Sequence, residues 1–121
     1  MKIADNPDFW HLLDEMIATH KIVIDRPKNS RHPAFHECIY PVDYGYLKGT
    51  SSMDGEGIDL WRGTSPSQML TAIFVTVDPA KKDSEIKLLI GCTDHEIKQI
   101  DHFFNDYDSM KGLLIYREDK E

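Results

Sequence analysis

Cysteine, long apolar runs and surplus positive charge are all scarce in this sequence. Of its 121 residues, two are cysteines, Cys38 and Cys92, which is too few for a disulfide framework, and their spacing is not that of a CxxC metal site. No stretch approaches the roughly 18 apolar residues of a membrane-spanning helix, and the first residues lack the apolar core of a secretion signal. The net charge of −7 disfavours binding to a bare phosphate backbone. We therefore expect one cytoplasmic domain over residues 1–121, without a nucleic acid or a membrane as partner.

Short apolar patterns follow one another along the chain. Apolar residues recur at helical spacing in residues 9–17, behind Asn6 and Pro7, and again in residues 97–107, behind a capping box of Thr93 and Glu96. Alternating and β-branched stretches predict strands at residues 21–25, 40–48, 58–61, 68–77, 85–92 and 112–116, with a long loop over residues 28–37. These elements predict an α+β fold, a small OB-like β-barrel, closed or partly closed, flanked by an N-terminal and a C-terminal helix.

An acidic loop stands out between the second and third predicted strands. Its sequence, residues 54–59, is D-G-E-G-I-D, so that Asp54, Glu56 and Asp59 enter the sheet together. Carboxylates this close repel one another unless a cation compensates them, and an all-oxygen cluster suits Mg²⁺ or Mn²⁺ better than zinc. A solvated acidic turn is the alternative interpretation.

Two further groups of polar residues lie on the neighbouring predicted strands. Alternation places Glu85 and Lys87 on one face, close to Asp83, where a plain surface ion pair is the alternative. Tyr40, Tyr44 and Tyr46 also share a face, either in the core or with hydroxyls at the rim of a phosphate site.

A pair of histidines on the long loop imitates a zinc site. His32 and His36 are spaced by four residues, but Pro33 between them argues against a regular helix, so we expect a surface loop there.

These motifs together resemble a known family. The stretch Y-P-V-D-Y-G-Y at residues 40–46, followed by D-G-E-G-I-D, is similar to paired motifs of the soluble inorganic pyrophosphatases of the first family. The resemblance extends to I-V-I-D-R-P at residues 22–27, E-I-K at residues 85–87 and H-F-F with a tyrosine at residues 102–107, which together span most of the chain.

The resemblance implies Mg²⁺-dependent hydrolysis of pyrophosphate, with Mn²⁺ as a substitute ion, and a homo-oligomer. It assigns the metal to Asp54, Asp59 and Glu85. Asp83 is a further metal candidate, because it is the only acidic residue near the position of the D-E pair that precedes the D-x-K strand in the family. It places the general base at Glu56. Contacts to phosphate fall to four residues: Tyr44, Lys87, Tyr107 and Arg31.

The sequence also departs from the family pattern. Glutamate replaces aspartate at positions 56 and 85, Gly57 replaces a proline, and Asp108 replaces a lysine. The segment between Asp25 and Tyr40 is too short to contain the family strand that carries a site lysine and a site glutamate. Lys28 and Glu37 are the only candidates for these two residues. Two alternatives follow: hydrolysis of another diphosphate or phosphate ester, or a non-catalytic domain that binds a metal, an anion or a partner chain.

Overall fold

A computed structural model of the chain describes residues 6–52 and 55–117. These residues form two helices and six strands, which run in the order α1 (Pro7–Thr19), β1 (Ile22–Arg26), β2 (Asp43–Leu47), β3 (Ile58–Arg62), β4 (Leu70–Asp78), β5 (Asp83–Ile90), α2 (Asp94–Asn105) and β6 (Lys111–Tyr116). Every predicted helix and strand is present, with small shifts at its ends. In the described part of the chain, no helix is both long and apolar enough to span a membrane.

One six-stranded sheet connects all the strands in the order β1-β2-β3-β5-β4-β6. Neighbouring strands are antiparallel except β3 and β5, which run parallel. Within the described ranges β1 and β6 are edge strands, so the sheet is not closed, and the prediction of a small α+β, OB-like fold is confirmed. The parallel β3–β5 pair matters most for function, because it places Asp59 opposite Lys87.

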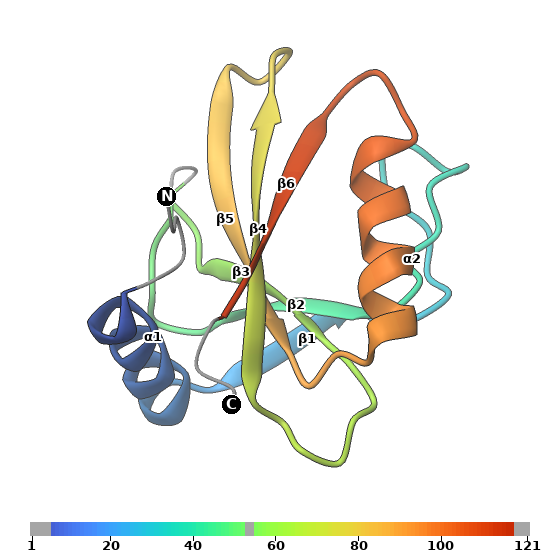
Figure 1. Ribbon diagram of the computed structural model, residues 1–121. Helices are drawn as coiled ribbons and strands as arrows, with labels where there is room; N and C mark the ends of the chain where they lie inside the picture. Colours follow the sequence, from blue (N-terminus) through green and yellow to red (C-terminus); the bar gives the residue numbers. More distant parts are fainter. Residues whose placement is uncertain (1–5, 53–54, 118–121) are drawn as a thin grey trace.

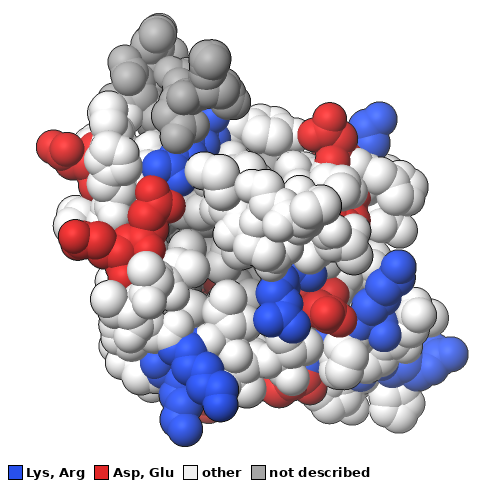
Figure 2. Space-filling model, turned by 90° about the horizontal axis from the view of Figure 1, so that it is seen from below, with Lys and Arg blue, Asp and Glu red and all other residues white. Residues whose placement is uncertain are grey.

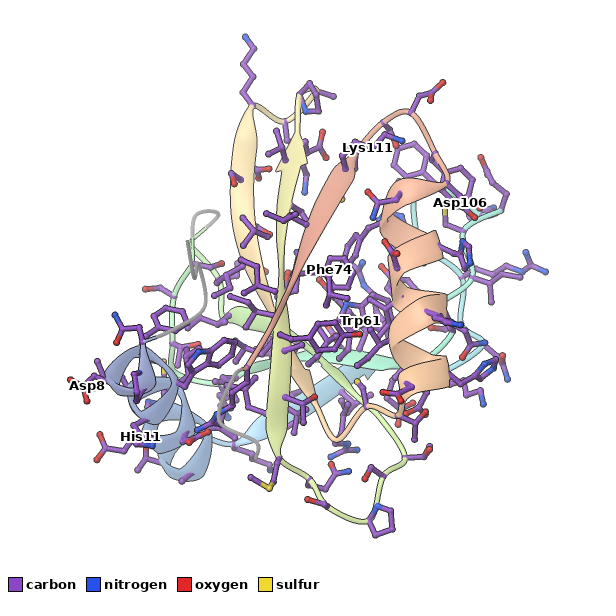
Figure 3. All side chains as sticks on the ribbon, viewed as in Figure 1. Asp8, His11, Trp61, Phe74, Asp106 and Lys111 are labelled. Atoms are coloured by element: carbon purple, nitrogen blue, oxygen red, sulfur yellow. The ribbon has the colours of Figure 1, made fainter. Side chains whose placement is uncertain are left out.

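The sheet is covered by a helix on each face (Figure 1). Alternate residues of the central strands point to opposite faces, so Leu60 and Leu88 pack toward α1 while Trp61 and Leu89 pack toward α2. Figure 3 shows Trp61 and Phe74 between the sheet and α2, and both side chains are fully buried. The two apolar layers hold the central strands, and therefore the polar residues at their ends, in fixed positions.

The first helix begins where the sequence predicts. The side chain of Asn6 accepts a hydrogen bond from the Phe9 backbone N–H at 3.1 Å, and Pro7 occupies the first turn, where its missing N–H costs nothing. Trp10 is the buried residue of this helix, while Leu12, one of the predicted apolar positions, is 64% exposed. The Arg117 guanidinium lies 5.7 Å from the Trp10 ring and donates to Asp14, which ties the end of β6 to α1.

The capping box of the second helix is confirmed. Thr93 accepts a hydrogen bond from the Glu96 backbone, and the Glu96 carboxylate accepts in return from the Thr93 backbone. The helix ends at Asn105, and for this reason the extension of its apolar face to Tyr107 is wrong: that ring lies beyond the helix and is 43% exposed.

Glycine is required where β1 and β2 approach each other. A Cβ atom at Gly45 would lie 1.8 Å from the carbonyl oxygen of Val23, which the backbone cannot relieve without separating the strands. The close approach of the two backbones thus explains why residue 45 is a glycine.

Candidate active site

A cavity of about 540 Å³ opens beside α2, where β1, β2, β3 and β5 present their polar residues. The strand register explains its composition: Tyr46 lies opposite Asp59 on β2 and β3, and Asp59 lies opposite Lys87 on β3 and β5. Glu85 stands two residues before Lys87 and so shares its face. The lining combines charged and aromatic side chains: Asp25, Arg26, His32, Tyr40, Tyr44, Tyr46, Glu56, Gly57, Asp59, Lys81, Glu85, Lys87, Phe103, Phe104 and Met110.

Lys87 is the centre of a compact polar cluster in this cavity. Its Nζ donates to Asp59 Oδ2 at 2.7 Å, to Glu85 Oε1 at 2.8 Å and to the Tyr44 hydroxyl at 3.1 Å. Tyr44 in turn donates its hydroxyl proton to Asp59 Oδ2 at 2.7 Å. Lys87, Glu85 and Tyr44 are each less than a tenth exposed, so the cluster is held by the fold rather than by solvent.

The cluster fixes the protonation of its two proton donors. Burial raises the pKa of the Tyr44 phenol, which keeps this group neutral and able to donate. Burial alone would lower the pKa of Lys87, but the Asp59 carboxylate and the hydrogen bonds to Asp59 and Glu85 outweigh it and raise the pKa. Lys87 is therefore a permanent cation at neutral pH.

The carboxylates have the chemistry of a magnesium site. Glu85 Oε2 is a buried oxygen without a hydrogen-bond partner among the described residues, which leaves one acceptor open for a cation. In residues 6–52 and 55–117, no three Asp, Glu, His or Cys side chains form a complete metal cage. Mg²⁺ does not need one, because it commonly binds one or two carboxylates together with waters and substrate phosphates. Asp59 and Glu85 fit this mode, while Asp54 lies outside the described residues.

The loop that carries Glu56 delivers this residue to the same cavity. Glu56 is exposed and lines the cavity on the side of the acidic loop. The next residue is held tightly: a Cβ at Gly57 would lie 2.6 Å from the Leu47 carbonyl oxygen and 2.7 Å from the Tyr46 ring. The glycine that replaces the family's proline thus lets the loop lie close against β2.

Three of the predicted site residues lie outside this cavity. Arg31 is exposed and donates to the His36 carbonyl oxygen at 2.8 Å. Asp83 begins β5 at the far end of the hairpin, paired with Asp78. Tyr107 lies beyond α2, close to Cys38, and its backbone carbonyl accepts a hydrogen bond from Lys111.

The remaining candidates from the long loop are also not part of the cavity lining. The Lys28 backbone donates to Asp43 at 2.8 Å, and Glu37 is exposed. His36 is likewise exposed on this loop.

Arg26, His32 and Lys81 are cavity residues that the sequence motifs do not reveal. In the sequence Arg26 stands in the stretch I-V-I-D-R-P, which gives no sign that its side chain enters a cavity, because the β-bulge that redirects it depends on pairing with β2. His32 stacks on Tyr40, with ring centres 6.2 Å apart and planes 8° from parallel. Its place inside the cavity follows from the path of the loop and has no local signal.

Comparison with known proteins relates this chain to inorganic pyrophosphatases, although no protein-family model matches it. The inorganic pyrophosphatase of Methanosarcina acetivorans is 26% identical, over 78% of this chain and 77% of its own length. Those of Methanosarcina mazei and Geobacillus stearothermophilus are also 26% identical. In these two cases the chain spans 62% and 58% of the relative's length.

Solved structures support the relationship at the level of the fold. The inorganic phosphatase of Anaplasma phagocytophilum superposes with a TM-score of 0.54 at 15% identity, over 78% of this chain and 81% of that structure. The inorganic pyrophosphatase of Helicobacter pylori gives a TM-score of 0.52 at 16% identity, with the same coverage. In sequence and in fold, the chain is a divergent relative of the inorganic pyrophosphatases.

Proposed function

We propose that this protein hydrolyses inorganic pyrophosphate to two phosphates with the help of Mg²⁺, for which Mn²⁺ can substitute. The observation that carries the proposal is the buried cluster of Tyr44, Asp59, Glu85 and Lys87 in one cavity with Glu56. Each of these residues stands in a motif that resembles the pyrophosphatases, and the relatives found by sequence carry that name.

The carboxylates define one side of the proposed reaction. Asp59 and Glu85 would hold Mg²⁺, with Asp54 as a third ligand by resemblance. When bound, this ion neutralises phosphate charge and lowers the pKa of the attacking water. Glu56, which faces the cavity from its loop, accepts the proton of that water as a general base.

Lys87 and Tyr44 define the other side of the reaction. The Nζ of Lys87 is permanently charged, and although its three donors are engaged by Asp59, Glu85 and Tyr44, its positive charge would stabilise the negative charge on the phosphoryl group as the bond to the leaving phosphate breaks. Tyr44 remains protonated and holds Asp59 in place through its 2.7 Å hydrogen bond. An acidic protein with a net charge of −7 can thus bind an acidic substrate, because the charges at the site are reversed locally.

The test is phosphate release from pyrophosphate, from an organic diphosphate and from a phosphate monoester, each with Mg²⁺ and with Mn²⁺. We expect pyrophosphate to give the highest kcat/KM. Glu56→Gln should lower this value by about 100-fold or more, because a positioned general base contributes about 10²–10⁴-fold. Glu15→Gln, on the exposed side of α1, is the matched control. A higher kcat/KM for the organic diphosphate would replace the proposal with hydrolysis of that substrate class.

A further inference from the structure

The cavity has a second group of basic residues, separate from the cluster around Lys87. Arg26 lines it from the end of β1, and His32 and Lys81 line it from the long loop and the β4–β5 turn. Among residues 6–52 and 55–117, no carboxylate forms an ion pair with Arg26, although Lys87 has two such partners. A guanidinium that borders a cavity without a carboxylate partner has unused capacity to bind an anion.

The Arg26 guanidinium is held in position by aromatic residues. A β-bulge between Ile24 and Arg26 shifts the register with β2, and such bulges redirect the side chains that follow. The guanidinium then donates to the Tyr40 hydroxyl. Its central carbon lies 5.6 Å from the Tyr40 ring centre and 6.0 Å from the Tyr44 ring centre. Tyr40 is only 2% exposed, so this support is rigid.

Arg26 and Lys87 border the same part of the cavity. The Nζ of Lys87 lies 5.8 Å from the Tyr44 ring centre, almost the same distance as Arg26. Lys87 has the two carboxylates beside it, while Arg26 has the polar hydroxyl of Tyr40. Two cations that share one aromatic neighbour suit a ligand with two linked anionic groups.

The cavity residues near Arg26 carry charges of both signs, the cation Lys81 and the carboxylate of Asp25, which adjoins Arg26 in the chain. Burial lowers the pKa of His32, and the charges of Arg26 and Lys81, which line the same cavity, lower it further. Lys81 is held by its turn, where its backbone N–H donates to Asp78 Oδ1 at 3.2 Å. A bound phosphoryl group would relieve the repulsion between these groups.

We propose that Arg26 is a second substrate-binding residue, which holds the phosphoryl group of a diphosphate that does not lie against Asp59 and Glu85. The inference rests on the proposed function, since it assigns a residue to the same substrate. Arg26 would supply the planar, two-point contact to phosphate oxygens that arginine makes and lysine does not. It would also supply a phosphate-binding cation of the kind that the sequence motifs assign to Arg31, which the structure places outside the cavity.

The experiment measures binding of methylenediphosphonate, a diphosphate analogue that is not hydrolysed, by calorimetry with and without Mg²⁺. The chain is compared with Arg26→Met, Arg26→Lys and Tyr40→Phe, after circular dichroism has confirmed that each is folded. We expect Arg26→Met to raise the Kd by about 10- to 100-fold, the loss that follows from removing a charge-assisted hydrogen-bonding group. The Kd of Arg26→Lys should lie between those of the natural chain and Arg26→Met. Tyr40→Phe keeps the guanidinium, so it should change the Kd by less than Arg26→Met.

Arg62→Met is the matched control, because Arg62 ends β3 and does not line the cavity. The inference is overturned if folded Arg26→Met binds the analogue as tightly as the natural chain, or if the natural chain binds no analogue at all. Its failure differs from failure of the proposed function. Arg26-dependent binding without phosphate release from pyrophosphate would support the inference and refute hydrolysis, whereas normal release with an unchanged KM in Arg26→Met would refute the inference alone.

Discussion

Replacement of Lys87 by methionine removes the cation that the buried carboxylates share. Glu85 and Lys87 have side chains that are each only 8% exposed, and Asp59 is 23% exposed. Removing one partner of a buried ion pair leaves an uncompensated charge and costs about 3–5 kcal/mol. The partial exposure of Asp59 screens its share, so we expect Lys87→Met to lower the free energy of unfolding by about 3 kcal/mol. For a domain of this size the melting temperature should fall by roughly 10 °C.

Urea denaturation measures this loss, with Lys48→Met as the control at an exposed lysine. The double variant Glu85→Gln with Lys87→Met should lose less than Lys87→Met alone, because it removes the stranded charge as well as the lysine. Mg²⁺ should stabilise Lys87→Met more than the natural chain, since the ion no longer competes with Nζ for the same oxygens. At ten times its Kd this stabilisation amounts to about 1.4 kcal/mol. A loss below about 1 kcal/mol for Lys87→Met, the value of an exposed pair, would refute the reasoning.

Two further predictions concern the second helix and the cavity histidine. Thr93→Ala should destabilise the protein by about 1 kcal/mol through loss of the capping hydrogen bond, with exposed Lys98→Ala as the control in thermal unfolding. Burial opposes ionisation of the Glu96 carboxyl, but hydrogen bonds from Thr93 and Thr64 outweigh this effect and lower its pKa. The ionised carboxylate therefore stabilises the folded protein at pH values above the ordinary pKa of glutamate. This stabilisation is lost as the pH falls through the lowered pKa of the folded state. Glu96→Gln should therefore flatten the acid side of the stability curve, and an unchanged slope would contradict this. Because burial, Arg26 and Lys81 lower the pKa of His32, its imidazole should titrate by NMR below the ordinary pKa of 6.5. Methylenediphosphonate should raise this pKa, because the bound anion offsets the charges of Arg26 and Lys81; an unchanged pKa would contradict this.

The helices and strands follow closely from local patterns in the sequence. Asn6 with Pro7 and Thr93 with Glu96 are signals read within one turn, so both helix starts are confirmed. Alternation along the strands likewise identifies the faces of Glu85 and Lys87, which the structure brings to the same cluster. These features depend on residues that are close together in the chain, and for this reason they can be predicted from a single sequence.

The parts of the site that the sequence does not reveal depend on contacts between distant segments. Arg26 reaches the cavity through a bulge in its pairing with β2, and His32 reaches it by stacking on Tyr40. Arg31, five residues after Arg26, turns instead to the carbonyl of His36. Motif spacing cannot distinguish these neighbouring arginines, because the difference lies in the strand register and the path of the loop.

Charges of both signs are distributed over one face of the molecule. Figure 2 shows that, among the described residues of this face, Lys and Arg side chains form small groups separated by Asp, Glu and uncharged residues. The predicted homo-oligomer remains a prediction, which sedimentation velocity at several protein concentrations would test.

The most direct test of the account is phosphate release from pyrophosphate in the presence of Mg²⁺, comparing the natural chain with Asp59→Asn. Both proteins are first checked for folding, because Asp59 also pairs with Lys87 at 2.7 Å. The account predicts measurable release by the natural chain and a decrease of about 100-fold or more in the variant, as expected when a charge essential for phosphoryl transfer is lost. Absence of release by the natural chain, or equal release by a folded Asp59→Asn variant, would contradict it.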